Sequence, residues 1–214
     1  MTAGDPRGMP VRAASYATST RGSDHLRSNP YVEEIITPEE ARQWFGSEEA
    51  ADLKGITGKG RLLKFSEDLV TIADILGLCK FAYYRSASMN YLYEKGAVLA
   101  TALFNNCSGA NLTPEEMIQR GEVTFNIEKC FNAREGATRA DDVIPARFFE
   151  QPIIGGASAG ATVEIDKFER VLDEYYESRG WDVHTSLPRK KKLSELGLDD
   201  VYQNMSKSPK IAAT

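Results

Sequence analysis

The sequence predicts an all-α fold. Apolar residues recur at helical spacing in several segments, and segments with strand-like alternation are few and short. The tetrapeptide Thr-Pro-Glu-Glu, a strong helix start, occurs at residues 37–40 and again at residues 113–116. Together these patterns favour a chain of helices joined by loops, with no sheet.

The first segment is expected to be the least regular. Residues 1–36 are rich in Gly, Ser, Pro and Arg and lack helical periodicity, so we expect a loop with short structured turns. The chain opens on a dense polar motif rather than on an element that begins a fold, as expected for part of a longer protein. The first helix is expected after Thr37, with Thr37 as N-cap and Pro38 at the first helical position.

Three helices are predicted in the middle of the chain. The first runs from Arg61 and ends at Gly77, because its apolar residues share one face: Leu62, Phe65, Leu69, Ile72 and Leu76. Residues 91–104 are apolar on most sides and predict a buried helix. The third follows Thr113 and carries an apolar stripe made of Val123, Ile127, Cys130 and Phe131.

The last part of the chain predicts two further helices. Residues 153–161 are Gly-rich and are interpreted as a linker. Residues 166–179 carry apolar side chains at helical spacing, so a helix is expected there that ends before Gly180. Residues 188–196 predict a last short helix. We therefore expect a loop-rich cofactor-lining segment (1–36), a main helical domain (37–152) and a C-terminal helical subdomain (153–214).

Composition excludes several functional classes. The 26 basic and 31 acidic residues give a net charge of -5, which argues against nucleic-acid binding. The basic run at residues 189–192 is interpreted as a solvated helix start, and His184 as solvent-facing. No apolar run is long enough for a membrane span or a secretory signal, and three widely spaced cysteines do not suggest disulfides. A cytoplasmic, reducing location is expected.

The densest chemical motif is Asp-Ile-Leu-Gly-Leu-Cys at residues 74–79. It places an acidic side chain, Asp74, about one turn before the expected break at Gly77, and a thiol, Cys79, directly after it. Asp74 can accept hydrogen bonds from an amino-bearing heterocycle, and Lys80 beside Cys79 favours the metal-binding thiolate. The alternative interpretation is structural, because acidic residues near helix ends and buried cysteines are both common.

This motif resembles the Asp-X-X-Gly-Leu-Cys motif of the aldehyde:ferredoxin oxidoreductase family of tungsten- or molybdenum-pterin enzymes. Segments along nearly the whole chain resemble the family in the same order: residues 5–9, 16–27, 126–142, 172–182 and 188–201. The resemblance implies the helical C-terminal domains of such a protein, without its N-terminal domain. It implies oxidation of an aldehyde to a carboxylic acid, with a [4Fe-4S] cluster, a tungsten- or molybdenum-bis-molybdopterin, and ferredoxin as partner.

The resemblance also implies roles for particular residues. Asp74, with Gly77 and Leu78 of the same motif, would bind the pterin, and Cys79 would be the last ligand of the iron–sulfur cluster. His25 is the catalytic candidate, since a histidine in this region lies beside the metal and can shuttle a proton. Arg7 and Arg21 are candidates for pairing with a pterin phosphate, because a guanidinium fork suits phosphate.

The chain departs from the family pattern in two ways. The other three cluster cysteines and a second pterin motif lie upstream in the family, together with an N-terminal domain, and this sequence has none of them. Cys107 and Cys130 are expected to be buried small hydrophobes instead. A missing N-terminal half or subunit is therefore an expected partner, and the chain alone is expected to be inactive.

Three alternatives remain open at the level of sequence. The chain could belong to a sister enzyme that acts on another substrate, such as an aromatic acyl thioester. It could be a non-catalytic helical fragment without cofactor. It could also be one subunit of a split enzyme whose N-terminal half is a separate chain.

Overall fold

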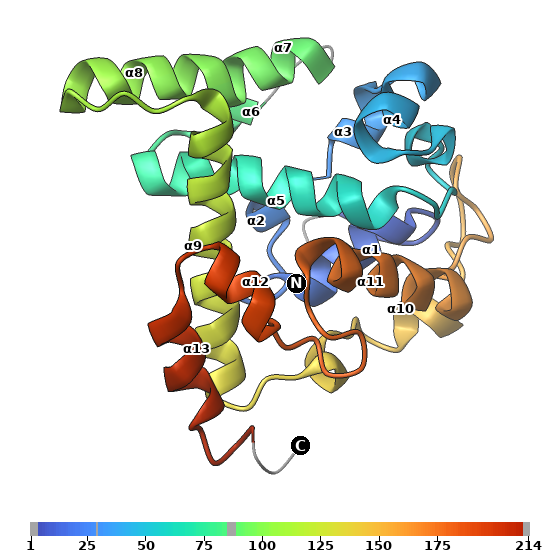
Figure 1. Cartoon of the computed structure of the whole chain (residues 1–214). Helices are drawn as coiled ribbons and strands as arrows, with labels where there is room; N and C mark the ends of the chain where they lie inside the picture. The colour runs from blue at the N-terminus through green and yellow to red at the C-terminus, as the bar shows by residue number, and fades with distance from the viewer. Residues whose placement is uncertain (1–3, 29, 85–88, 212–214) are drawn as a thin grey trace.

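The computed structural model describes residues 4–28, 30–84 and 89–211, and within these ranges the chain is helical with no extended strand. Figure 1 shows α5 (Lys59–Leu76) running through the middle of the molecule, crossed by the long helix α9 (Pro114–Arg134) and flanked by α11 (Ile165–Arg179). The predicted all-α class is confirmed. None of the described helices has the length and apolar character needed to span a bilayer.

The remaining helices are short and surround this framework (Figure 1). In chain order they are α1 (Pro10–Thr18), α2 (His25–Ser28), α3 (Val32–Ile35), α4 (Pro38–Phe45), the 3-10 turn η1 (Glu48–Ala51), α6 (Lys80–Tyr84), α7 (Met89–Tyr93), the π-helical segment η2 (Glu94–Leu99), α8 (Ala100–Ser108), the 3-10 turn η3 (Arg139–Asp141), α10 (Arg147–Glu150), α12 (Lys190–Glu195) and α13 (Asp199–Ser206).

Two helix starts form as predicted. Thr37 accepts a hydrogen bond from the backbone N–H of Glu40, while the Glu40 side chain accepts one from the backbone N–H of Thr37. Thr113 and Glu116 make the same reciprocal pair at the start of α9. Each pair satisfies backbone donors that the first helical turn leaves without a partner, which fixes where the helix begins.

The expectation of a loop at residues 1–36 is wrong, because this segment contains α1, α2 and α3. Val11, Ala13 and Ala14 on α1 are completely buried in the main hydrophobic core. The same core includes Leu62 and Leu63 of α5 and Trp181. Helix α1 was not predicted because it carries few local signals: Met9 at its N-cap makes no side-chain hydrogen bond, and its ends have neither an acidic first turn nor a basic last turn.

The helix predicted at residues 91–104 is only half buried. Leu92, Ala97 and Ala100 lie in the core, but Leu99 and Leu103 are about half exposed, at 52% and 51%. This segment comprises α7, η2 and α8 at one edge of the molecule (Figure 1), where the rest of the described chain covers only one of its faces. Cys107, near the end of α8, is exposed, so its predicted burial is wrong.

The apolar stripe predicted on α9 is also divided. Cys130 is buried with α12 and α13 residues, but Ile127 and Phe131 are exposed. The face of α9 that meets the core is partly polar instead. Asn126 accepts a hydrogen bond from the indole of Trp181 at 2.9 Å, and Lys129 donates to Asp142 at 3.1 Å. These hydrogen bonds satisfy buried polar groups that the apolar pattern does not reveal.

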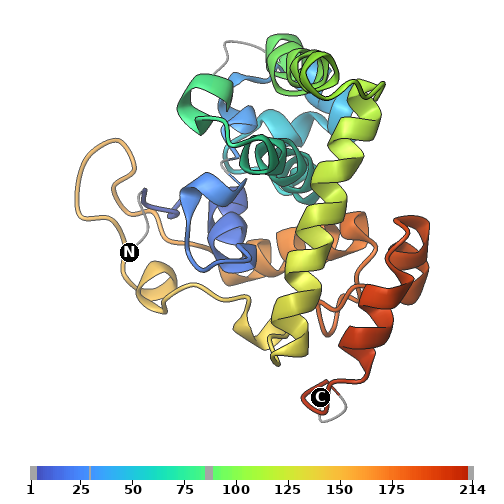
Figure 2. The same ribbon diagram turned by 90° about the vertical axis from the view of Figure 1, so that its left-hand side faces the viewer.

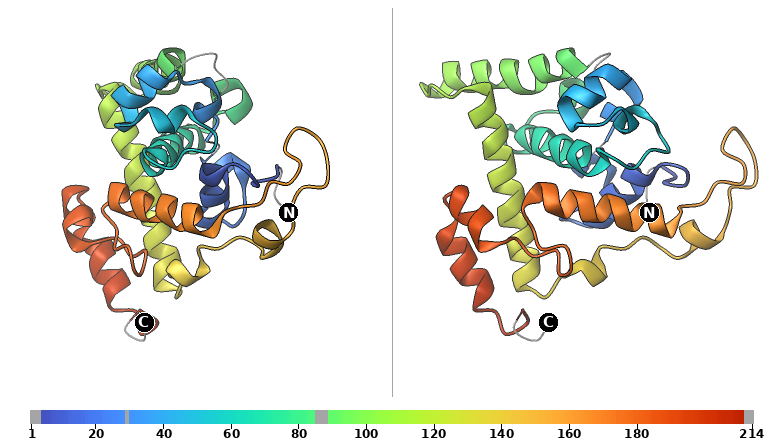
Figure 3. Two further views of the ribbon diagram at one scale, coloured as in Figure 1. Left: turned by 90° about the vertical axis from the view of Figure 1, so that its right-hand side faces the viewer. Right: turned by 45° about the vertical axis from the view of Figure 1, so that its right-hand side comes forward.

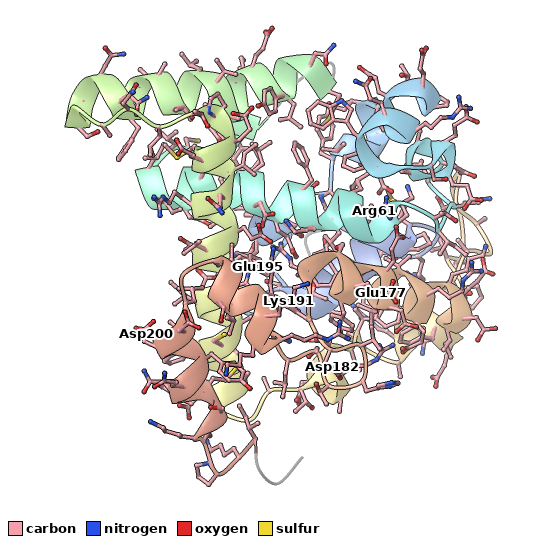
Figure 4. All side chains as sticks on the ribbon, in the orientation of Figure 1. Arg61, Glu177, Asp182, Lys191, Glu195 and Asp200 are labelled. Atoms are coloured by element: carbon pink, nitrogen blue, oxygen red, sulfur yellow. The ribbon has the colours of Figure 1, made fainter. Side chains whose placement is uncertain are left out.

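The C-terminal segment contains the two predicted helices, α11 and α12, but the expectation that α12 is the last helix is wrong, because α13 follows it. Figure 3 shows the Gly-rich loop between α10 and α11 projecting away from the helices, with the backbone N–H of Ile153 donating to the Ala161 carbonyl at 3.1 Å. Helix α11 ends at Gly180, which has φ of 70°. In the basic run, residues 189–191 are exposed, as predicted, and Nζ of Lys191 lies 4.0 Å from Glu195 of α12 (Figure 4). Lys192 is instead only 19% exposed and contacts Glu122 of α9 at 2.7 Å. His184 is exposed, as predicted.

The crossing of α5 and α9 depends on a close backbone approach at Gly121. A Cβ added to Gly121 would lie 2.2 Å from the carbonyl oxygen of Asp68, which is backbone and cannot move aside cheaply. We expect Gly121→Ala to lower the free energy of unfolding by about 3 kcal/mol, the upper end of the usual overpacking cost. Urea denaturation measures this. The control is Gly155→Ala in the projecting loop, where a Cβ meets nothing within 4 Å, and an equal loss there would contradict the account.

A buried ion pair makes stability depend on pH. Glu33 of α3 accepts from Lys59 at 2.8 Å, and neither side chain is exposed. Burial raises the pKa of Glu33 to about 7, although Lys59 opposes this shift. Between pH 4.5 and about 7 the folded state therefore retains a proton that the unfolded state has lost, so this group makes stability fall as pH rises.

Glu33→Gln should reduce that dependence. Between pH 5 and 7, the fall in unfolding free energy with rising pH should become less steep by up to about 1.4 kcal/mol per pH unit. Urea denaturation at several pH values measures the slope. Glu34→Gln on the same short helix is the matched control, because the Glu34 side chain is 39% exposed. An unchanged slope in Glu33→Gln would show that Glu33 does not titrate in this range.

Candidate functional site

The turn after α5 is built as the sequence predicts. Gly77 has φ of 67° and ends the helix, and the backbone N–H of Leu78 donates to the Ala73 carbonyl at 2.8 Å. This is the usual hydrogen-bonding pattern of a glycine-terminated helix. A Cβ at Gly77 would meet nothing within 4 Å, so the space beside the turn is open and the backbone conformation alone favours glycine there.

The Asp74 carboxylate lies between two cations. Arg27 Nη1 of α2 donates to Asp74 Oδ2 at 2.5 Å, and Lys80 Nζ at the start of α6 lies 2.8 Å from Asp74 Oδ1. Lys80 also donates to the carbonyl oxygen of Leu26 at 2.6 Å. Its ammonium group therefore points to Asp74 and α2. Burial lowers the pKa of Lys80, while the hydrogen bond to Asp74 opposes that shift.

Arg27 joins three segments that are distant in sequence. Its side chain is only 2% exposed, and its guanidinium lies 5.4 Å from the ring centre of Phe125. Besides Asp74, it contacts Glu128 of α9 through Nη2 and Thr20 through Nε at 3.0 Å. Thr20 in turn donates its hydroxyl to Glu128 at 2.6 Å. The result is a connected polar network beneath the end of α5.

This network forms one wall of a pocket of about 570 Å³. In Figure 2, α5 is viewed close to end-on, with α9 beside it. The pocket has a polar part and an apolar part, lined by Thr20, Arg21, Arg27, Asp74, Ile127, Glu128, Phe131 and Asn132. Asn132 donates its amide to the carbonyl oxygen of Thr20 at 2.6 Å, which closes the polar part.

Exposed apolar side chains accompany the polar network. Ile75, Leu78 and Phe81 are 43%, 36% and 62% exposed around the end of α5, and Ile127 and Phe131 are exposed on α9. The surface around residues 74–81 is therefore partly apolar and exposed. An apolar surface of this kind, next to a polar pocket, is typical of a region that other groups cover.

The predicted site residues are only partly brought together. Asp74 and Arg21 line the same pocket, and Gly77, Leu78 and the exposed Cys79 follow Asp74 on the turn. Arg21 donates to Asp24 at 2.7 Å, so its charge is already paired within the loop before α2.

His25 and Arg7 do not line this pocket. The His25 side chain is 42% exposed, and its Nδ1 lies 3.8 Å from Asp24. Arg7 donates from Nε to Asp5 at 2.9 Å and from Nη1 to the carbonyl oxygen of Gln151 at 2.6 Å. Its guanidinium is thereby engaged at the loop after α10.

Arg27 and Glu128 contribute to the site although the sequence predicts no role for them there. Lys80, expected from the sequence to favour the thiolate of its neighbour Cys79, pairs with Asp74 instead. Arg27 and Glu128 both lie within segments that carry the family resemblance, at residues 16–27 and 126–142. The only indication of a role in the sequence is that each is a charged residue within a segment that resembles the family. Their contact could not be read from the sequence, because they are 101 positions apart.

Iron and other metals have few protein ligands here. Across the part of the chain that the structure describes, no group of three or more His, Cys, Asp or Glu side chains is arranged to hold a metal ion. Cys130 is buried, and burial raises the pKa of its thiol to about 12. Cys79 is exposed on the turn and fits the role of a single thiolate ligand, whereas a four-iron cluster requires ligands from elsewhere.

Comparison with known proteins supports the resemblance. Residues 1–198 match the family model described as aldehyde ferredoxin oxidoreductase, domains 2 & 3. The tungsten-containing aldehyde ferredoxin oxidoreductase of Pyrococcus furiosus is 31% identical over 200 residues, covering 92% of this chain. The proteins of the same name from Pyrococcus horikoshii and Thermococcus kodakarensis are each 29% identical, over 92% and 91% of the chain. The chain spans 29% of the length of each relative.

Proposed function

Because this chain belongs to the aldehyde ferredoxin oxidoreductase family, we propose that it forms part of the cofactor site of an enzyme that oxidises aldehydes to carboxylic acids. The observation that carries the proposal is the turn at Gly77. That turn places the Asp74 carboxylate at a pocket and leaves the Cys79 thiol exposed directly after it. Aldehyde and ferredoxin enter the proposal through the names of the relatives.

The residues of the turn have chemically suitable roles. The Asp74 carboxylate, held by two cations, would accept hydrogen bonds from the amino-bearing ring of a molybdopterin. Gly77 and Leu78 would allow the ring to approach, since the space beside Gly77 is open. Arg21 would pair with a pterin phosphate, and it is better placed than Arg7 because it lines the same pocket as Asp74.

Cys79 would supply one thiolate ligand to an iron–sulfur cluster. The tungsten- or molybdenum-pterin group and the cluster would supply the two-electron chemistry and the electron path to ferredoxin. Conversion of an aldehyde to an acid adds the oxygen of water and releases two protons with two electrons. His25, whose ring is 42% exposed, would accept one of these protons, the role that the resemblance implies for it.

The rest of the site would come from polypeptide outside this chain. The other cluster ligands and the second half of the pterin cradle would be provided by the same protein or by a separate N-terminal subunit, in the cytoplasm. This fits the span of the chain, which is 29% of the length of its relatives. It also fits the exposed side chains of Ile75, Leu78 and Phe81, which such a polypeptide would cover.

Metal analysis tests the proposal. The chain expressed alone is expected to contain little or no iron or tungsten, because one cysteine cannot hold a four-iron cluster. Co-expression with the N-terminal part of a family member should give about four iron atoms per chain and aldehyde-dependent reduction of ferredoxin. Near-stoichiometric iron in the isolated chain would contradict the proposed sharing of ligands. Metal loading without aldehyde oxidation would indicate a different substrate, such as an aromatic acyl thioester.

A further inference from the structure

We propose that Arg27 is a positioning residue, which fixes the direction of the Asp74 carboxylate toward the bound pterin. The inference rests on the proposed function, because it concerns how Asp74 is presented to the cofactor. Arg27 itself is buried at 2% exposure, so it acts through Asp74 rather than by contact with the ring.

The geometry gives Arg27 control over the carboxylate. One end of its guanidinium donates to Asp74 Oδ2 at 2.5 Å, while the other contacts Glu128 and Thr20. The three partners come from α5, α9 and the loop before α2. Since the guanidinium is planar and rigid, anchoring it at Glu128 and Thr20 fixes where Nη1 lies and therefore where Asp74 points.

The charges are balanced within the network. Arg27 and Lys80 provide two cations, and Asp74 and Glu128 provide two carboxylates. Without Arg27, Asp74 would retain Lys80 but Glu128 would lose the cation that it shares with Asp74, and the two carboxylates would repel each other. Lysine at position 27 would restore the charge but not the fork, because an ammonium group is a point charge without a fixed plane.

The carboxylates around Arg27 are more exposed than those around Arg179, which form a buried structural cluster elsewhere in the chain. Arg179 also contacts two carboxylates, but Glu67 and Asp68 are 0% and 2% exposed, so that cluster closes the core. The carboxylates held by Arg27 are 30% and 38% exposed and line a pocket. A buried arginine that presents two accessible carboxylates at a pocket is arranged to orient ligand-binding groups.

The test measures binding of free pterin, 2-amino-4-oxopteridine, to the full chain by quenching of the fluorescence of the probe. Arg27→Lys is expected to weaken binding about tenfold, as loss of an orienting contact does elsewhere. Arg139→Lys is the matched control, because Arg139 also pairs with two carboxylates, Glu169 and Asp173, and lies outside the pocket. Its affinity should stay within about twofold of the unchanged chain, as expected for a distant, independent site.

A double-mutant cycle separates positioning from stability. Asp74→Asn should weaken binding in the unchanged chain and have a much smaller effect in Arg27→Lys, because both changes remove the same oriented acceptor. If Arg27→Lys does not fold, Glu128→Gln serves instead. It retains Arg27 and the side-chain size, removes the anchoring charge, and should also weaken binding.

The possible results are distinct. Unchanged pterin affinity in folded Arg27→Lys, or in Glu128→Gln where that variant replaces it, would overturn the inference and leave the proposed function standing. Equal weakening in Arg139→Lys would also overturn it, since the effect would then follow from loss of stability. Absence of saturable binding by the unchanged chain would contradict the assignment of the pterin to this turn, and the inference with it.

Discussion

Replacement of Arg179 by methionine is expected to lower the free energy of unfolding by about 3–5 kcal/mol, the usual cost of removing one partner from a buried ion pair. Arg179 is completely buried and donates to Glu67 at 2.6 Å and to Asp68 at 2.5 Å. Tyr175 donates its hydroxyl to the same Glu67 carboxylate at 2.6 Å. Without Arg179, the buried Glu67 carboxylate loses its cation, and Asp68 retains only Lys64 at 2.8 Å.

The loss should grow with pH. Burial already raises the pKa of Glu67 to about 7, and Arg179 is the first of the influences that oppose this shift. Removing Arg179 raises the folded pKa further, so the variant retains a proton on Glu67 that its unfolded state loses above about pH 4.5. As pH rises, the stability of the variant therefore falls more than that of the unchanged chain. The difference in unfolding free energy between the two should be larger at pH 8 than at pH 5.

Urea denaturation at both pH values measures these effects, with Arg139→Met as the matched control. Arg139 also contacts two carboxylates, but these are 48% and 52% exposed, so its removal should cost about 1 kcal/mol or less. Equal losses of unfolding free energy in the two variants would show that the buried Arg179 ion pairs stabilise the fold no more than the exposed ion pairs of Arg139.

The second large effect is expected from Cys79→Ser in the assembled protein. Serine is nearly isosteric with cysteine, and Cys79 is exposed, so folding should change little. A hydroxyl is a far poorer ligand for iron than a thiolate, so iron binding and electron transfer should be severely reduced. The measurements are iron content, visible absorbance of the cluster and ferredoxin reduction.

The two other cysteines provide controls with opposite expectations. Cys107→Ser changes an equally exposed thiol on α8 and should leave both iron and stability unchanged. Cys130→Ser places a hydroxyl among Ala133, Leu193 and Met205, and should cost about 1–3 kcal/mol while retaining iron. If Cys79→Ser retains full cluster absorbance, Cys79 is not a ligand.

The parts of the fold that could be predicted from the sequence are those set by local interactions. Gly77 ends α5 because a left-handed residue favours glycine, and Thr37 and Thr113 begin helices through contacts within four residues. Each signal lies next to the structure that it determines. The candidate site residues at 74–79 and the turn on which they lie could therefore both be predicted from the same short stretch of sequence.

The parts that could not be predicted depend on contacts between distant segments. Helix α1 is held by burial of Ala13 and Ala14, and it lacks both a side-chain hydrogen bond at its N-cap and an acidic first turn. Lys129 faces the core because Asp142 and Ser186 receive its hydrogen bonds at 3.1 and 2.9 Å. Arg27 likewise contacts Glu128, which lies 101 positions away in the sequence, because the fold brings the two charges together. Pairing of buried charges is a tertiary property, and a single sequence does not encode it in any local pattern.

We expect the turn at residues 74–79 to belong to a shared pterin and iron–sulfur site. A crystal structure of the chain assembled with the N-terminal part of a family member, with anomalous diffraction data collected at the iron absorption edge, tests this directly. It should show an iron atom bonded to Sγ of Cys79 and a pterin ring hydrogen-bonded to the Asp74 carboxylate. A cluster bound entirely by other residues, with Cys79 and Asp74 facing solvent or protein alone, would contradict it.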